Sequence, residues 1–104
     1  MLEKIKSGIL GLAIGDAVGV PAEFKSRNEL KASPVTSMIG YGTYNLPPGS
    51  WSDDTSMTLA LLDTLMPGFK YSQIMDAFKA WMLEGKYTPW EELFDIGNTC
   101  YIDI

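Results

Sequence analysis

A chain of 104 residues, 46% of them hydrophobic, is long enough to bury one core and too short for two domains. Acidic side chains outnumber Lys and Arg by 13 to 8, and the resulting net charge of -5 argues against nucleic acid as a partner, because phosphate binding depends on Lys and Arg. The chain has no histidine and one cysteine, Cys100, so a zinc site is nearly excluded and any bound metal must be held by oxygen atoms.

The cysteine content also bears on the compartment. A single cysteine forms no intramolecular disulfide, which fits a reducing cytoplasm. Residues 4–20 imitate a signal peptide only faintly, because Glu3 and Asp16 flank the apolar run and no Ala-x-Ala site follows it. The run is also shorter than the ~20 apolar residues that cross a bilayer. We therefore expect a cytoplasmic protein with no membrane partner.

The first predicted element is a helix over residues 2–19, where apolar residues recur at helical spacing. Gly8, Gly11, Gly15 and Gly19 form a bare stripe along it, although each glycine weakens a helix by about 1 kcal/mol relative to alanine. Such a stripe lets another group approach closely. It fits a second helix packed tightly against this one, or a ligand or active-site loop that comes near, and both can hold at once.

A long loop comes next. Residues 21–51 contain four prolines and three glycines, and Pro21 ends the first helix. A short helix is expected within the loop at residues 26–31. Ordered loops of this length in a compact domain are typically functional.

Two further helices have clear sequence signals. One begins near Ser52 and runs to about Met66, and Pro67 follows as a stop. Ser72 is expected to cap the other, which keeps the i, i+3, i+4, i+7 apolar pattern as far as Gly85.

The last part of the chain has weaker signals. Thr88-Pro89-Trp90-Glu91 has the form of a capping box with proline at the first helical position, so a short helix should start there. Asn98 could cap one more. Because no alternating strand pattern of useful length occurs, we predict an all-α fold of about four to five helices with a long loop containing Pro and Gly.

Acidic residues stand where the long loop becomes a helix. Ser52, Asp53 and Asp54 offer a hydroxyl and two adjacent carboxylates, the ligands that Mg²⁺ or Mn²⁺ prefers. The same residues have a structural explanation, since serine caps helices and acidic residues complement the positive end of the helix dipole. A second acidic pair, Asp16 and Glu23, lies in a glycine-rich setting. Two acidic clusters in one small domain favour the metal site over the purely structural explanation.

The two members of that second pair are expected to differ in role. An unpaired carboxylate in the apolar segment around Asp16 would be costly, so we expect Asp16 to accept hydrogen bonds in a structural role. Glu23 lies just beyond the helix, on a loop that could bring it to the same mouth as Asp53 and Asp54.

Three stretches carry a family resemblance. GILGLAIGDAVGVPAEF at residues 8–24 is similar to an amino-terminal glycine-rich motif, WSDDTSM at 51–57 to a Thr-Asp-Asp-Thr-x-Met metal motif, and FDIGNT at 94–99 to a substrate-site segment. In this order they resemble the ADP-ribosylglycohydrolases, which include the dinitrogenase reductase-activating glycohydrolases. The resemblance implies that residues 1–104 are the amino-terminal part of a larger domain of orthogonal helices, whose carboxyl-terminal part is absent.

The resemblance also implies a chemistry. The family uses a binuclear Mg²⁺ or Mn²⁺ centre that binds ribose hydroxyls and a water, and it cleaves the N- or O-glycosidic bond at the anomeric carbon. Ser52, Asp53 and Asp54 would be metal ligands, with Ser52 in place of the family's usual threonine. Glu23 matches a glutamate near the metals, as proton acceptor for the attacking water or as partner of the ribose.

Asp95, Gly97 and Asn98 match a segment that lines the ADP-ribose site, although a helix-capping turn explains the same residues. The family completes its metal shell with an Asp-x-Asp-Ser/Thr motif near the carboxyl end, and nothing after Asp54 has that form. By itself the chain should therefore bind metal weakly and hydrolyse poorly or not at all, as expected of a truncated gene product or part of a longer protein.

Two functions follow from the resemblance. The first is a hydrolase that removes ADP-ribose from a modified protein or small acceptor, completed by the missing carboxyl-terminal part or by another chain. The second is a catalytically inert relative or fragment that binds ADP-ribose or pairs with another chain.

Overall fold

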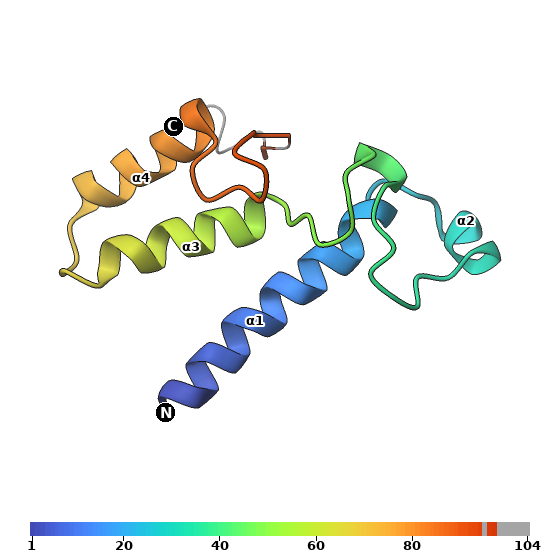
Figure 1. The fold of residues 1–104 in the computed structure, drawn as a ribbon, viewed down its shortest axis with the longest axis horizontal. Helices are drawn as coiled ribbons and strands as arrows, with labels where there is room; N and C mark the ends of the chain where they lie inside the picture. The colour runs from blue at the N-terminus through green and yellow to red at the C-terminus, as the bar shows by residue number, and fades with distance from the viewer. Residues whose placement is uncertain (95, 98–104) are drawn as a thin grey trace. The chain divides into compact units, whose positions relative to one another are not determined.

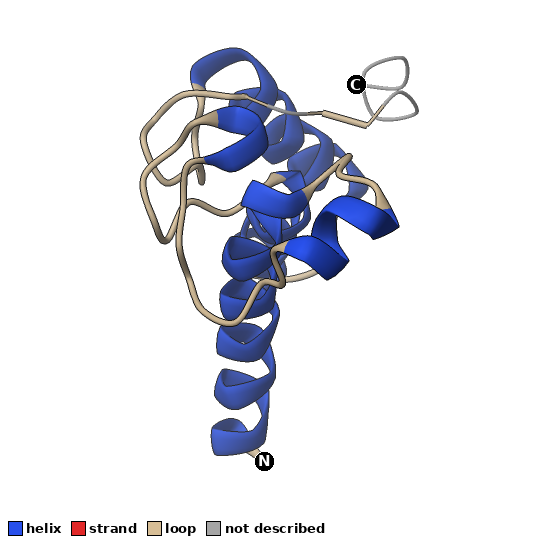
Figure 2. Cartoon of the chain, turned by 90° about the vertical axis from the view of Figure 1, so that its right-hand side faces the viewer, coloured by secondary structure: helices blue, strands red, loops and turns tan. Residues whose placement is uncertain are grey.

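The computed structural model describes residues 1–94, 96 and 97. Helices and loops make up this part of the chain, without a β-strand, as Figure 1 and Figure 2 show. The predicted all-α class is therefore confirmed. The chain divides into two compact units, Met1–Trp51 and Ser52–Ile104.

The first unit opens with helix α1 (Leu2–Gly19), whose bounds agree with the predicted ones. A 3₁₀ turn, η1 (Val20–Ala22), continues from it and carries Pro21. Apart from the chain neighbours and the backbone of α1 itself, a Cβ atom added at any of the four glycines of the stripe would have none of the unit's described atoms within 4 Å. The tightly packed helix that the stripe suggested is therefore not found within this unit.

Helix α1 and turn η1 together form a long apolar segment. Leu2–Ala22 is 21 residues long and contains an 18-residue window with a mean hydropathy of 1.3, which by length and composition is enough to cross a bilayer. The expectation that this run is too short is therefore wrong. Core helices of soluble proteins and amino-terminal signal sequences have the same length and composition, so these properties alone do not place the helix in a membrane.

The long loop of the first unit contains two short helical turns. Helix α2 (Arg27–Ala32) lies one residue from its predicted position, and the Ser26 hydroxyl caps it by accepting the Glu29 N–H at 3.1 Å. The 3₁₀ turn η2 (Gly42–Tyr44) packs against η1. The loop is thus folded back onto the end of α1.

The second unit is a pair of packed helices, α3 (Asp53–Leu65) and α4 (Tyr71–Glu84), which lie side by side in Figure 1. Ala60 of α3 and Trp81 of α4 are both 0% exposed and form the centre of this core. The start of α3 after Ser52 is confirmed. The prediction that Ser72 caps α4 is wrong, because Ser72 already lies inside the first turn of the helix. The N-cap residue is Lys70, whose side chain makes no capping hydrogen bond.

The chain beyond α4 folds back on the helix end. Gly85 ends the helix at φ +72°, and a Cβ there would stand 2.2 Å from the Glu91 carbonyl oxygen, so only glycine fits. The helix predicted from Thr88 is wrong. Thr88 donates its hydroxyl to the Gly85 carbonyl instead of capping, and Glu91 has φ +60°, which no α-helix admits. The suggested helix after Asn98 lies outside the described residues.

Candidate metal and substrate site

The first turn of α3 carries the three predicted metal ligands. Ser52 is 5% exposed, and its Oγ accepts the Asp54 N–H at 3.3 Å. Asp53 is half-buried and Asp54 is exposed. The capping explanation is thereby confirmed for Ser52, and both carboxylates lie at the positive end of the helix. Three consecutive oxygen-bearing side chains still have the donor chemistry that Mg²⁺ or Mn²⁺ prefers.

The segment after α4 returns to this turn. The Gly97 N–H donates a hydrogen bond of 3.2 Å to Asp53 Oδ2, across 44 residues of sequence. The structure thus brings together a predicted metal ligand and a predicted substrate-site residue. Asp95 and Asn98, the other two residues of the predicted substrate segment, lie outside the described residues.

A set of contacts that sequence reasoning missed ties this returning segment to α3. The Ser56 hydroxyl, on a residue only 1% exposed, donates to the Tyr87 carbonyl at 3.0 Å. The Tyr87 hydroxyl donates to Asp63 Oδ2 at 2.5 Å. Burial of the phenol, with the hydrogen bond to Asp63 and the negative charge of that carboxylate, raises the pKa of Tyr87 to about 12. The local sequence does not single out Ser56, because seven of the thirteen residues of α3 are polar.

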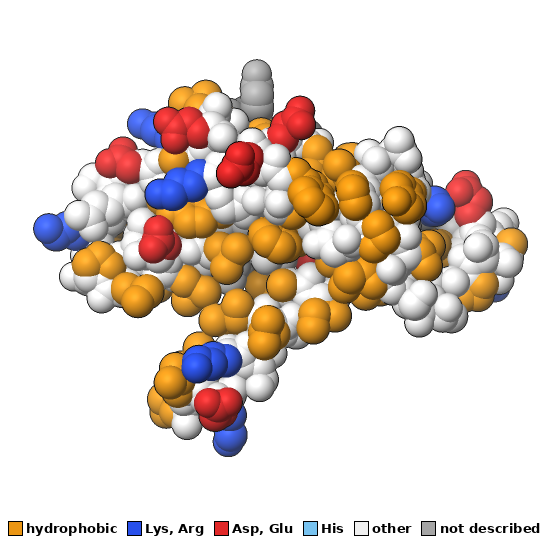
Figure 3. All heavy atoms as spheres, in the orientation of Figure 1, with side chains coloured by type: hydrophobic (Ala, Val, Ile, Leu, Met, Phe, Trp, Pro, Cys, Tyr) orange, Lys and Arg blue, Asp and Glu red, His pale blue; other side chains and the backbone are white. Residues whose placement is uncertain are grey.

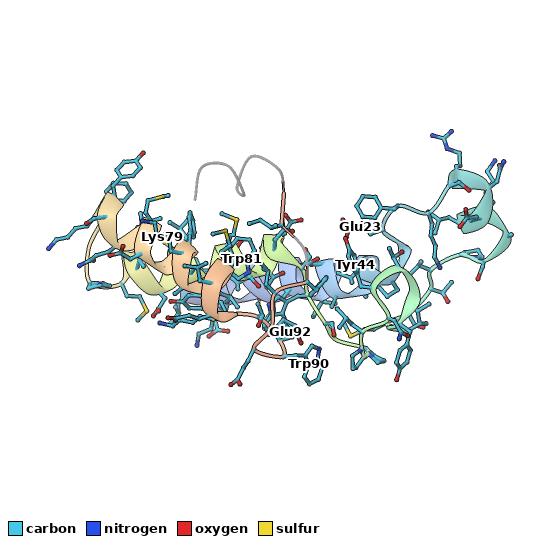
Figure 4. All side chains as sticks on the ribbon, turned by 90° about the horizontal axis from the view of Figure 1, so that it is seen from above. Glu23, Tyr44, Lys79, Trp81, Trp90 and Glu92 are labelled. Carbon is cyan, nitrogen blue, oxygen red and sulfur yellow. The ribbon has the colours of Figure 1, made fainter. Side chains whose placement is uncertain are left out.

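Glu23 is held in the first unit by the contact between η1 and η2. The Thr43 hydroxyl donates to the carbonyl oxygens of Pro21, at 3.2 Å, and of Glu23, at 2.5 Å. Gly42 has φ +58°, and a Cβ there would stand 2.2 Å from the Pro21 carbonyl, so glycine permits this close approach. Figure 4 labels the half-buried Glu23, which directly follows η1, and Tyr44, the last residue of η2.

Two predictions about the first unit's carboxylates stay predictions. Asp16 is half-buried in the last turn of α1, which is compatible with the structural role expected of it. The meeting of Glu23 with Asp53 and Asp54 at one mouth is untested, since these residues belong to different units.

The oxygen atoms of Ser52, Asp53 and Asp54 are the type of ligand that a hard cation prefers, but they are too few to fill its coordination shell. Within neither unit do the described residues bring together three or more His, Cys, Asp or Glu side chains that could hold a metal ion. Because Mg²⁺ keeps several waters when few protein ligands are present, the set at α3 suits a hydrated ion whose remaining ligands come from elsewhere.

Comparison with known proteins relates this site to a family. A sequence profile described as ADP-ribosylglycohydrolase matches residues 1–102. The chain is 41% identical over 99 residues to the ADP-ribosylarginine hydrolase Tri1 of Pseudomonas putida (strain GB-1), an alignment that covers 93% of this chain and 26% of that protein. It is 38% identical over 100 residues to the protein of the same name from Serratia proteamaculans (strain 568), with 94% and 26% covered.

A third relative has a different named substrate. The ADP-ribosyl-[dinitrogen reductase] glycohydrolase of Rhodospirillum rubrum is 34% identical over 102 residues, which cover 94% of this chain and 32% of that protein. The chain therefore spans about a quarter to a third of the length of these relatives. Because the family profile matches almost every residue, from 1 to 102, the chain belongs to the ADP-ribosylglycohydrolase family.

Proposed function

We propose that this chain is part of a metal-dependent hydrolase that removes ADP-ribose from a modified protein side chain, with ADP-ribosylarginine as the favoured substrate. The observation that carries the proposal is the 41% identity, over 93% of the chain, to a protein named for hydrolysis of ADP-ribosylarginine. The relative named for ADP-ribosyl-[dinitrogen reductase] also acts on a modified protein.

The metal would be held at the start of α3. Ser52, Asp53 and Asp54 are the residues that would bind Mg²⁺ or Mn²⁺, in a centre that is binuclear when the family domain is complete. Bound there, the cation would polarise the ribose hydroxyls and a water. It would also offset the repulsion between the diphosphate of ADP-ribose and a chain of net charge -5.

The proton transfer is assigned to Glu23. As the water oxygen attacks the anomeric carbon, the Glu23 carboxylate accepts the water's proton. The bond from the anomeric carbon to the arginine nitrogen breaks, and the leaving guanidine keeps the electron pair. It then takes up the proton that Glu23 has accepted, which returns Glu23 to its carboxylate form. Asp95, Gly97 and Asn98 are assigned to contacts with the ADP-ribose group.

The test is a chimera in which residues 1–104 replace the matching quarter of the Pseudomonas putida relative. Release of ADP-ribose from ADP-ribosylated arginine and serine peptides is measured before and after chelation, and after Mn²⁺ is added back. We expect release from arginine that chelation abolishes and Mn²⁺ restores. Glu23→Gln should lower the rate by about 10²–10⁴-fold while metal binding persists. Metal-independent release would contradict the proposal.

A second candidate function is an inert relative or fragment that binds ADP-ribose or pairs with another chain. The incomplete set of acidic ligands within each unit's described residues favours it. Calorimetry on the 104-residue chain distinguishes the two: binding of ADP-ribose without Mn²⁺, combined with an inactive chimera, would favour the inert relative.

A further inference from the structure

Hydrogen bonds fasten the described chain after α4 to α3. We call residues 85–94, 96 and 97 the return segment. Its attachments are the hydrogen bonds Tyr87 hydroxyl to Asp63, Ser56 hydroxyl to Tyr87 carbonyl, and Gly97 N–H to Asp53. The last of these ends on a predicted metal ligand.

We propose that the return segment positions the Asp53 carboxylate for a divalent cation, with the Gly97 N–H as the orienting donor and Tyr87 as the anchor. This inference rests on the proposed function, since it requires the metal site at Ser52, Asp53 and Asp54.

The hydrogen bond to Asp53 restricts the carboxylate to fewer orientations. Asp53 is half-buried at the first position of α3, and an aspartate side chain has several rotamers that aim its carboxylate in different directions. With Oδ2 accepting an N–H at 3.2 Å, rotation of the carboxylate breaks the bond. Hydrogen-bond partners of this kind orient metal-ligating groups in proteins and raise their affinity for the metal.

A backbone donor orients its partner only if the loop that carries it is itself held. Tyr87 holds the loop through both its side chain and its backbone. Its hydroxyl donates a hydrogen bond to Asp63, and its carbonyl oxygen accepts one from the buried Ser56 hydroxyl. The close approach of Gly85 to the Glu91 carbonyl further fixes the first half of the return segment against the end of α4.

The role proposed for position 97 requires its backbone N–H and does not require glycine. Unlike Gly85, Gly97 does not have a positive φ, and a Cβ there would stand 3.9 Å from Asp53 Oδ2, an ordinary van der Waals contact. Gly97→Ala therefore keeps the donor, and Gly97→Pro removes it. These two variants form a matched pair.

The experiment titrates the chain and its variants with Mn²⁺ and follows the free and bound ion by electron paramagnetic resonance. We expect Gly97→Pro and Tyr87→Phe to weaken Mn²⁺ binding by about tenfold and to change the spectrum of the bound ion. Gly97→Ala should leave both unchanged. Thr64→Val, which removes a hydrogen bond within α3 far along the helix from Asp53, controls for a general loss of stability.

The outcomes distinguish failure of the positioning role from failure of the proposed metal site. If Asp53→Ala leaves Mn²⁺ affinity unchanged, the metal site itself fails. If Asp53→Ala abolishes binding but Gly97→Pro binds as Gly97→Ala does, the positioning role is overturned. Should Gly97→Pro lose its helical circular dichroism, Tyr87→Phe decides: weaker binding with an altered spectrum supports the role, and wild-type binding overturns it.

Discussion

Ser52 and Asp53 each make a hydrogen bond that has a purely structural explanation, yet neither bond excludes a metal. The Ser52 Oγ accepts the Asp54 N–H, and Asp53 Oδ2 accepts the Gly97 N–H. A hydroxyl oxygen has two lone pairs and a carboxylate about four, so each side chain can accept a bond from the backbone and also bind a cation. At the scale of the residue, helix capping and metal binding are compatible.

The carboxylates of α3 can be tested separately from that of α1. Asp53→Ala and Asp54→Ala should abolish binding of Mg²⁺ or Mn²⁺, because two of the three donors at this turn are carboxylates. Asp16→Ala should leave metal affinity unchanged and lower the free energy of unfolding by about 1 kcal/mol, the usual worth of a side-chain hydrogen bond. Isothermal calorimetry and urea unfolding measure the two effects. Unchanged metal affinity in both α3 variants would refute the assigned ligands.

Tyr87 should make stability depend on alkaline pH. Its pKa is raised to about 12 from the ordinary 10.0, so the folded state holds the phenol proton more tightly than the unfolded state does. The stabilisation is therefore complete below pH 10 and is lost as the pH rises from 10 to 12. Urea unfolding at a series of pH values should show this loss, and Tyr87→Phe should reduce it. An identical pH dependence in the variant would exclude Tyr87 as its source.

At the scale of the element, local sequence accounts for most helix boundaries. Helix α1 and the start of α3 agree with prediction because apolar spacing, Pro21 and the Ser52 cap are signals within a few residues. The capping box at Thr88 failed because the Schellman-type end of α4 turns the chain back at Gly85, and the Thr88 hydroxyl is used there. The capping signal at Thr88 thus lost to a second local signal, the glycine that ends α4 three residues earlier.

Two glycines in different elements should respond oppositely to alanine. Gly85→Ala should lower the free energy of unfolding by about 1–3 kcal/mol or more, because φ is +72° and the new Cβ meets the Glu91 carbonyl. Gly15→Ala should raise the helicity of α1 and stabilise it by about 1 kcal/mol, since nothing in its unit lies within 4 Å. Circular dichroism and urea unfolding measure both. A destabilised Gly15→Ala variant would instead indicate that another helix packs on the glycine stripe.

At the scale of the whole molecule, apolar surface exceeds what the described structure covers. Figure 3 shows hydrophobic side chains along α1. Exposed apolar patches of this kind mark surfaces that meet another protein, another part of a domain or a membrane. The most exposed large hydrophobic side chains on α1 are Leu2 at 63%, Leu10 at 61% and Ile14 at 53%.

We expect the 104-residue chain to associate through this surface. Sedimentation should show oligomers, and Leu10→Gln with Ile14→Gln should shift the population toward the monomer, because burial of leucine-sized side chains drives association. Glu29→Gln, on exposed α2, is a control that changes no apolar surface. Partition of the chain into neutral lipid vesicles, with a monomer in buffer, would favour a membrane partner for α1 instead.

The sequence by itself determined the helical class, the family and most helix boundaries, because these depend on periodicity, caps and motifs that can be read within a short window. It also predicted site roles for Asp53 and Gly97, as a metal ligand and a substrate-site residue respectively. Only the tertiary structure decided that these two residues meet, that Tyr87 anchors the chain between them through Asp63 and Ser56, and that the helix expected at Thr88 does not form. Those contacts join residues 24 to 44 apart. Their formation depends on how α3 and α4 pack, and no local pattern encodes that packing.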